Sequence, residues 1–248
     1  METRPGTGSG AGYDPSIVST PEKSSLVEDF IDIFYAPSSV FARREKSGFW
    51  AHLLVVTVIA ALFAFANRSV FDQIFDAEFS RATAKAMADN PQITSEMMET
   101  QKKISSSIGG FFQYIGAPFL IFVVALLVWA AGRWIAGAKI TYQQAVLIMT
   151  LAFVPRLIQY LLTTVQMLFM DTAAVTSMHT LSFSPARFMD PDTPNRVLLG
   201  LMGRLDLFTI WVTILIGIGI AVMGKVSRTK GLIAAGVIWL LASLPLLR

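Results

Sequence analysis

The sequence predicts an all-α polytopic membrane protein with five transmembrane helices, and three observations lead to this fold class. Of the 248 residues, 54% are hydrophobic and only 15% are charged, with a mean hydropathy of +0.57. A soluble domain is about 45–50% apolar and about 25% charged. Five stretches approach the roughly 20 apolar residues that crossing the hydrocarbon core requires. The lysines and arginines gather at the ends of these stretches.

The first 24 residues are rich in Gly, Ser, Thr and Pro and contain almost no large apolar side chain. Such a segment cannot bury enough surface to offset the entropy of an ordered chain. We therefore expect residues 1–24 to form a disordered cytoplasmic tail. No basic start followed by an apolar core is present, so the pattern does not indicate a secretory signal peptide.

Residues 25–47 are predicted to form amphipathic helices. Leu26, Phe30 and Ile33 recur at helical spacing, and the neighbouring acidic residues fall mainly on the opposite side. Pro37 ends this first helix and opens a second short one, because proline has no N–H to lose at a helix start. We expect the pair to lie along the cytoplasmic surface of the bilayer.

The region 48–247 is predicted to be the transmembrane domain. Its spans lie at about 49–66, 111–131, 144–170, 207–223 and 231–247. Pro155 interrupts the third span. Residues 67–110 are too long for a plain connection and carry two apolar stripes separated by a turn, which predicts a non-cytoplasmic helical hairpin. The proline-containing loop 171–204 should be mostly irregular.

The distribution of basic residues predicts the orientation of the spans, because positive residues are retained in the cytoplasm. Three short segments carry them with a single acid, Glu45: Arg43, Arg44 and Lys46; Arg133 and Lys139; Lys225, Arg228 and Lys230. The segments on the other side mix both signs. The prediction is a cytoplasmic N-terminus and an outer C-terminus.

The sequence indicates no catalytic, cofactor or metal site. Without cysteine there is no thiolate nucleophile and no thiolate zinc site. His52 and His179 stand alone, with no second ligand at metal-binding spacing. The net charge of +3 comes from scattered residues at span ends, which favours topology signals over nucleic-acid binding.

The candidate intramembrane polar site is centred on Arg156, because a charge near the middle of a span costs at least about 2.5–3.5 kcal/mol. One interpretation is a site for an ion or an anionic ligand. The other is an arginine that snorkels, or that pairs with Asp171 or Asp206. Asp206 also suits the N-terminus of the fourth span. Gln159, Thr163 and Gln166 form one polar stripe, which interhelical hydrogen bonding explains without a pore.

Small residues predict where the last two spans pack together. Gly217, Ala221 and Gly224 share one face of the fourth span, and Gly231 and Ala235 share one face of the fifth. Small residues at this spacing let helices approach closely. We expect an antiparallel pair joined by a tight basic turn.

Several segments resemble the Yip family, the Ypt/Rab-interacting membrane proteins, in its bacterial branch. A proline followed closely by phenylalanine precedes the first span, and the resemblance continues over 139–155, 204–211 and 227–231. It covers roughly residues 28–247 and implies five spans with a cytoplasmic N-terminus. Eukaryotic members bind Rab-type GTPases and shape secretory vesicles, whereas the bacterial members have no settled role.

The resemblance and the lack of recognisable catalytic groups favour a non-catalytic membrane adaptor or organiser. Its expected partners are the lipid bilayer and either another protein or a second copy of the chain, not nucleic acid. The alternative is a small transporter or channel-like subunit that uses the polar stripe around Arg156.

Overall fold

The computed structural model describes residues 25–171, 175–193 and 195–244, and all regular structure within these ranges is helical. The all-α class is therefore confirmed for the described part of the chain. The predicted disordered tail, residues 1–24, lies outside the described residues, as do the last four residues.

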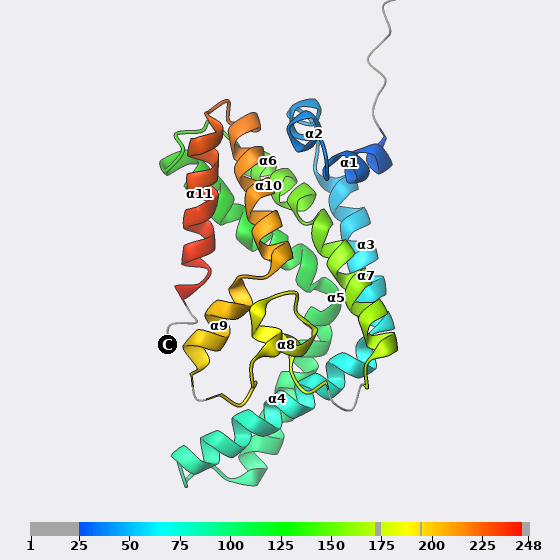
Figure 1. Cartoon of the computed structure of the whole chain (residues 1–248), viewed down its shortest axis with the longest axis vertical. Coiled ribbons are helices and arrows are strands. Elements are labelled where there is room, and N and C mark those ends of the chain that lie inside the picture. Colours follow the sequence, from blue (N-terminus) through cyan, green and yellow to red (C-terminus); the bar gives the residue numbers. More distant parts are fainter. Residues whose placement is uncertain (1–24, 172–174, 194, 245–248) are drawn as a thin grey trace, which may run out of the picture.

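Figure 1 shows the arrangement of the helices in an elongated bundle. In chain order they are α1 (Leu26–Asp32), α2 (Pro37–Arg43), α3 (Trp50–Ala66), α4 (Arg68–Asp89), α5 (Ser95–Trp134), α6 (Tyr142–Ala152), α7 (Val154–Phe169), α8 (Met178–Leu181), the 3-10 helix η3 (Pro185–Phe188), α9 (Arg196–Arg204), α10 (Leu207–Met223) and α11 (Arg228–Leu241).

Two to four segments of the described residues qualify as membrane spans by length and composition. Helix α5 and the stretch Tyr142–Phe169, which joins α6 to α7, each qualify alone. The pairs α3–α4 and α9–α10 qualify only if each is one span, bent by 71° and 55° respectively. Helices α3 and α10 coincide closely with the predicted spans at 49–66 and 207–223. The predicted total of five spans is not confirmed.

Helix α6 is the centre of the core. Every residue from 145 to 152 is buried, as expected for a helix that is apolar on all sides and surrounded by other helices. It packs against α5, α10 and α3, whose buried side chains include Ile121, Leu215 and Val56. Proline at the second position of α7 explains the predicted interruption, since α6 ends at Ala152 and α7 begins at Val154.

Exposed apolar stripes cover the outside of the bundle. On α3, Leu54, Val58, Leu62 and Phe65 recur at helical spacing and are 48–64% exposed. A soluble monomer rarely exposes contiguous apolar surface of this kind. Exposed apolar stripes of this kind are typical of helices that face lipid.

Two predicted boundaries differ from the structure. The second arm of the predicted hairpin (67–110) and the second span (111–131) are one continuous helix, α5, whose 40 residues reach about 60 Å at 1.5 Å per residue. No capped end separates the arm from the span, because backbone hydrogen bonding continues regardless of the surrounding solvent. The loop 171–204 was predicted to be mostly irregular but contains α8, η3 and α9.

The small residues of α10 and α11 meet in one close contact. A Cβ atom added to Gly231 would lie 2.2 Å from the carbonyl oxygen of Gly217, and one added to Gly217 would lie 2.8 Å from Leu232. Ala235 is buried on the same helix as Gly231. Gly224 departs from the predicted shared face, because it packs against Ala138 in the connection between α5 and α6.

We predict that Gly231→Ala destabilises the protein by about 1–3 kcal/mol, because overpacking forces the backbones of α10 and α11 apart. Gly236→Ala is the matched control on the same helix, where an added Cβ meets nothing within 4 Å. It should be neutral or stabilising by about 0.5–1 kcal/mol, as glycine is a poor helix former. Thermal unfolding in detergent measures both, and equal midpoints for the two variants would contradict the assigned contact.

Candidate functional site

A buried carboxylate holds the N-terminal helices on the end of the bundle. The Asp29 side chain is fully buried, and its carboxylate oxygens lie close to three basic nitrogens: Arg43 Nε at 2.7 Å, Arg44 Nε at 2.6 Å and His52 Nε2 at 2.8 Å. These residues belong to α1, to the end of α2 and to α3. A buried charge needs such partners, since desolvation without pairing is costly. We call α1 and α2, residues 26–43, the platform.

Local interactions fix the shape of the platform. Ser25 and Glu28 form a capping box at the start of α1. At its end, Asp32 accepts hydrogen bonds from the Tyr35 hydroxyl and from Arg43 Nη1 at 2.6 Å. These two bonds favour the charged carboxylate, so the pKa of Asp32 lies below its ordinary value.

The platform packs on the end of the bundle; that it also lies along the membrane surface stays a prediction. Phe30 meets the ring of His52 edge to face, with ring centroids 5.9 Å apart, and Phe34 meets Trp211 of α10 at 5.3 Å. Val40 and Phe41 of α2 are fully buried. Asp29, one of the acidic residues predicted to lie mainly opposite the apolar side of α1, is the one that points inward.

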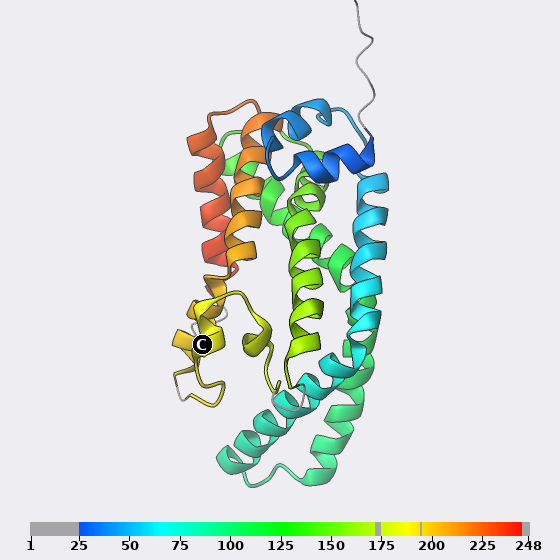
Figure 2. The same ribbon diagram turned by 45° about the vertical axis from the view of Figure 1, so that its right-hand side comes forward.

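Further polar contacts join the platform to the other connections at this end. Arg228 Nη2 donates to Ser38 Oγ at 3.1 Å, Lys225 pairs with Glu45 at 2.9 Å, and Gln144 Nε2 donates to the Glu45 carbonyl at 3.1 Å. The three basic segments therefore meet at one end of the bundle (Figure 2). Sequence reasoning interpreted Arg43 and Arg44 as topology signals and missed the cluster, because nothing in the spacing marks which acid turns inward.

The predicted polar site forms a second cluster inside the bundle. Arg156 Nη1 lies 3.3 Å from Asp206 Oδ1 and donates to Gln159 Oε1, while Nη2 donates to Thr209 Oγ1 at 2.6 Å. Of the two partners considered for Arg156, the structure selects Asp206. The geometry is that of a satisfied structural pair.

Asp206 also fulfils its other predicted role. Its carboxylate accepts the backbone N–H groups of Phe208 and Thr209, both at 3.0 Å, at the start of α10. It further accepts the N–H of Phe183 at 3.1 Å. One side chain thus connects α7, α10 and the segment between η3 and α8.

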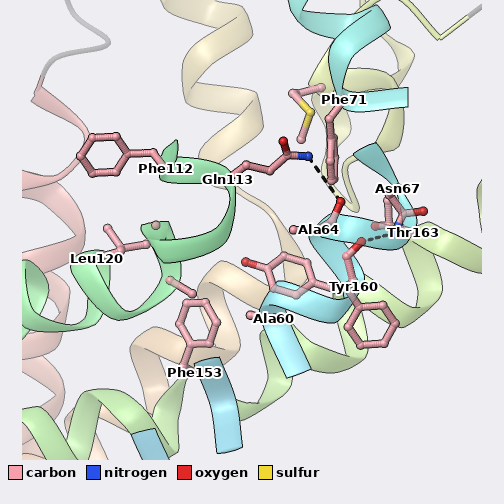
Figure 3. A pocket seen from close by; sticks show the side chains of 14 residues that line it. Ala60, Ala64, Asn67, Phe71, Phe112, Gln113, Leu120, Phe153, Tyr160 and Thr163 are labelled. Carbon is pink, nitrogen blue, oxygen red and sulfur yellow. Dashed lines mark hydrogen bonds between the residues drawn. The ribbon is translucent and has the colours of Figure 1, made fainter. Parts of the chain in front are cut away.

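The remaining stripe residues do not join this cluster. Thr163 lines a separate cavity of about 310 Å³ between α3, α5 and α7, drawn in Figure 3. Gln166 Nε2 lies 3.2 Å from Met170 Sδ. The stripe of Gln159, Thr163 and Gln166 is therefore divided among three environments.

The two histidines lie in different surroundings. His52 contacts Asp29, and His179 lies beside cavities described below. Within residues 25–171, 175–193 and 195–244, no three His, Cys, Asp or Glu side chains are grouped to hold a metal ion.

Comparison with known proteins places the chain among membrane proteins. The family model of the Yip1 domain matches residues 31–247. Membrane protein YknW of Bacillus subtilis is 26% identical over 215 residues, which cover 86% of this chain and 84% of that protein. No solved structure matches.

We predict that Asp29→Asn destabilises the protein by about 3 kcal/mol, the lower end of the range for removing one partner of a buried ion pair, because both arginines keep some contact with water. Asp32→Asn is the control: its side chain is 20% exposed, so water screens its pairing and its loss should destabilise the protein much less. Denaturant unfolding of both variants in detergent tests this, and equal losses would refute the special role of Asp29.

Proposed function

The chain belongs to the Yip1 domain family of membrane proteins, and we propose on this premise that it is a non-catalytic, multi-pass adaptor of the bacterial cell membrane. The platform is its proposed docking surface for a protein partner or a second copy of the chain. The observation that carries the proposal is the fixed attachment of the platform to the bundle through buried Asp29.

The proposed topology has five spans, with the platform in the cytoplasm. The three basic segments meet at one end, while the turn between α4 and α5 lies at the other end (Figures 1 and 2). Because basic segments are retained in the cytoplasm, their meeting at one end supports a cytoplasmic position for that end. Helices α10 and α11, at 17 and 14 residues, are each shorter than the roughly 20 residues of a full span.

The platform presents apolar side chains on the face that does not contact the bundle. Val27 is 65% exposed, Ile31 55% and Tyr35 71%, and the spacing of four residues places them on one side of α1 and the turn after it. A partner helix or loop binds such a row through apolar anchors. Fixing the row in advance reduces the entropy cost of binding.

The transporter alternative gains no support from the polar stripe. A conducting path needs polar groups that line one continuous route. Gln159 is engaged with Arg156, Thr163 faces a mainly apolar cavity, and Gln166 contacts Met170. The adaptor proposal is therefore the one we develop.

The topology proposal predicts which positions an impermeant thiol reagent labels in intact cells. The chain has no cysteine, so single cysteines report without interference. Gln92→Cys, in the turn after α4, should be labelled from outside. Ser39→Cys and Thr229→Cys should react only after the membrane is opened. Outside labelling of Thr229→Cys would contradict the orientation.

The adaptor proposal predicts capture of one protein at the platform. A photo-crosslinking residue placed at Ile31 should give a single protein adduct in cells, and mass spectrometry should identify it as a partner or a second copy of the chain. The same residue at Ile104, which is 51% exposed on α5, is the control for non-specific capture.

Two results decide the outcome of this experiment. Loss of the adduct in Asp29→Asn, at unchanged protein level, would support docking on the fixed platform. Adducts to lipid alone, or equal protein capture from both positions, would refute it.

A further inference from the structure

Two cavities of opposite character adjoin each other on either side of α7. The first is the apolar cavity of Figure 3, about 310 Å³, between α3, α5 and α7. Its walls are alanine, phenylalanine, leucine and glycine, with few polar groups. The Tyr160 hydroxyl points into this space (Figure 3) and has no hydrogen-bond partner among the described residues.

The second cavity is a basic chamber of about 430 Å³. Arg156, Arg196, Arg204, His179 and Asp206 contribute to its lining. Three guanidinium groups against one carboxylate leave an excess of two positive charges. Burial lowers the pKa of His179, with a smaller contribution from Arg196 and an opposing one from Glu78, so we count His179 as neutral near pH 7.

The partners of the three arginines differ. Arg156 pairs with Asp206. Arg204 bonds only uncharged groups, Ser243 Oγ at 3.1 Å and the Trp239 carbonyl at 3.4 Å. Within the described part of the chain, Arg196 makes no ion pair. Two cations of the chamber therefore have no carboxylate partner there, and a low-dielectric site favours an anion beside them.

The two cavities share a wall. Met178 lines both, and neighbouring residues of α7 divide between them: Arg156 and Gln159 face the chamber, while Tyr160 and Thr163 face the apolar cavity. A polar cavity of about 380 Å³, lined by Arg81, Lys85 and one acid, Glu78, of α4, shares Arg196 with the chamber. Basic lining thus continues from the chamber toward the hairpin.

We propose that these adjoining cavities bind one anionic phospholipid of the outer leaflet, with its phosphate in the basic chamber and an acyl chain in the apolar cavity. Arginine is the side chain best suited to phosphate, which it binds through two parallel hydrogen bonds. The apolar cavity provides the second recognition element, which a free anion would leave unused.

The position of the chamber agrees with this ligand. Helices α8 and α9 lie level with the lower part of α7 in both views (Figures 1 and 2). With α6, α7 forms a stretch of 28 residues, about 42 Å long and so longer than the hydrocarbon core of about 30 Å. Arg156 lies near the middle of this stretch and marks the inner limit of the chamber, whereas Arg196 belongs to α9, nearer the end of α7 that is away from the platform. The phosphate is therefore placed beside Arg196. The choice of leaflet rests on the topology proposed above, whereas binding itself does not.

The experiment uses the delipidated full-length chain in detergent, titrated with phosphatidylglycerol, phosphatidylcholine or inorganic phosphate and followed by native mass spectrometry. One phosphatidylglycerol should bind saturably, and more tightly than phosphatidylcholine. Arg196→Gln should weaken phosphatidylglycerol binding about tenfold, the loss of one charge-assisted hydrogen bond. Arg133→Gln, an exposed arginine near the opposite end of α5, removes the same charge and is the control.

A second pair of variants tests the apolar half. Gly116 lines the apolar cavity and has open space around an added Cβ, so Gly116→Leu should fill the cavity and weaken lipid binding several-fold without unfolding the protein. Gly110→Leu, on the same helix and also in open space, is the control. It should leave binding unchanged.

Three results would overturn the proposal. Lipid binding that neither Arg196→Gln nor Gly116→Leu weakens would indicate surface lipid only. Inorganic phosphate that binds as tightly as phosphatidylglycerol, with no effect of Gly116→Leu, would indicate a free-anion site. Equal binding of phosphatidylcholine would remove the role of the net negative charge. A failed topology experiment would change the leaflet and leave these results standing.

Discussion

The burial of Asp29 is the constraint on which the platform end of this molecule depends. A carboxylate removed from water is tolerated only with cations placed around it, and here they come from α2 and α3 as well as from the residue after α2. Satisfying one charge therefore fixes the positions of three chain segments. Two short helices of seven residues each, too short to be stable alone, become a defined surface on the bundle. Glu45, just after α2, also contacts Lys225 and Gln144. These contacts tie the platform to the segment after α10 and to the start of α6.

Asp206 plays a similar role inside the bundle, where it pairs with polar groups from several segments. Irregular backbone at the depth of a membrane persists only where its polar groups are bonded or face water. The segment between α7 and α10 contains irregular backbone, and the Asp206 carboxylate accepts hydrogen bonds from the Phe183 N–H and from the first free N–H groups of α10 and pairs with Arg156. A charge that is expensive to insert is thereby used for helix capping and for joining two spans. The bend of 55° between α9 and α10 occurs at this residue, which is consistent with a capped start and not with a continuous helix.

Sequence reasoning worked where the controlling interaction is local and failed where it depends on tertiary pairing. Apolar runs and the proline at 155 predicted the positions of α3, α10 and the break between α6 and α7, because contiguity and backbone hydrogen bonding are read along the chain. The inward turn of Asp29 was not predictable, since Glu28 and Asp32 have the same character in the same helix. The continuity of α5 was missed because a change of solvent from water to lipid alters side-chain preference and leaves the backbone ladder intact. For the candidate site, the sequence predicted the partner of Arg156 as one of two aspartates, but not the cavities on either side of α7.

The two polar regions differ in how completely their charges are compensated, and this difference separates structure from binding. At the platform end, Arg43, Arg44 and Lys225 each have a carboxylate within 2.9 Å, so the positive residues that direct topology also complete the packing. In the basic chamber, Asp206 serves Arg156, while Arg196 and Arg204 have no carboxylate partner within the described residues. Water can solvate these arginines where the chamber is open, but it makes no favourable contact with the walls of the apolar cavity beside them. An amphiphilic anion can occupy both cavities at once: its charged headgroup binds the arginines of the chamber, and its covalently attached apolar chain fills the neighbouring apolar cavity.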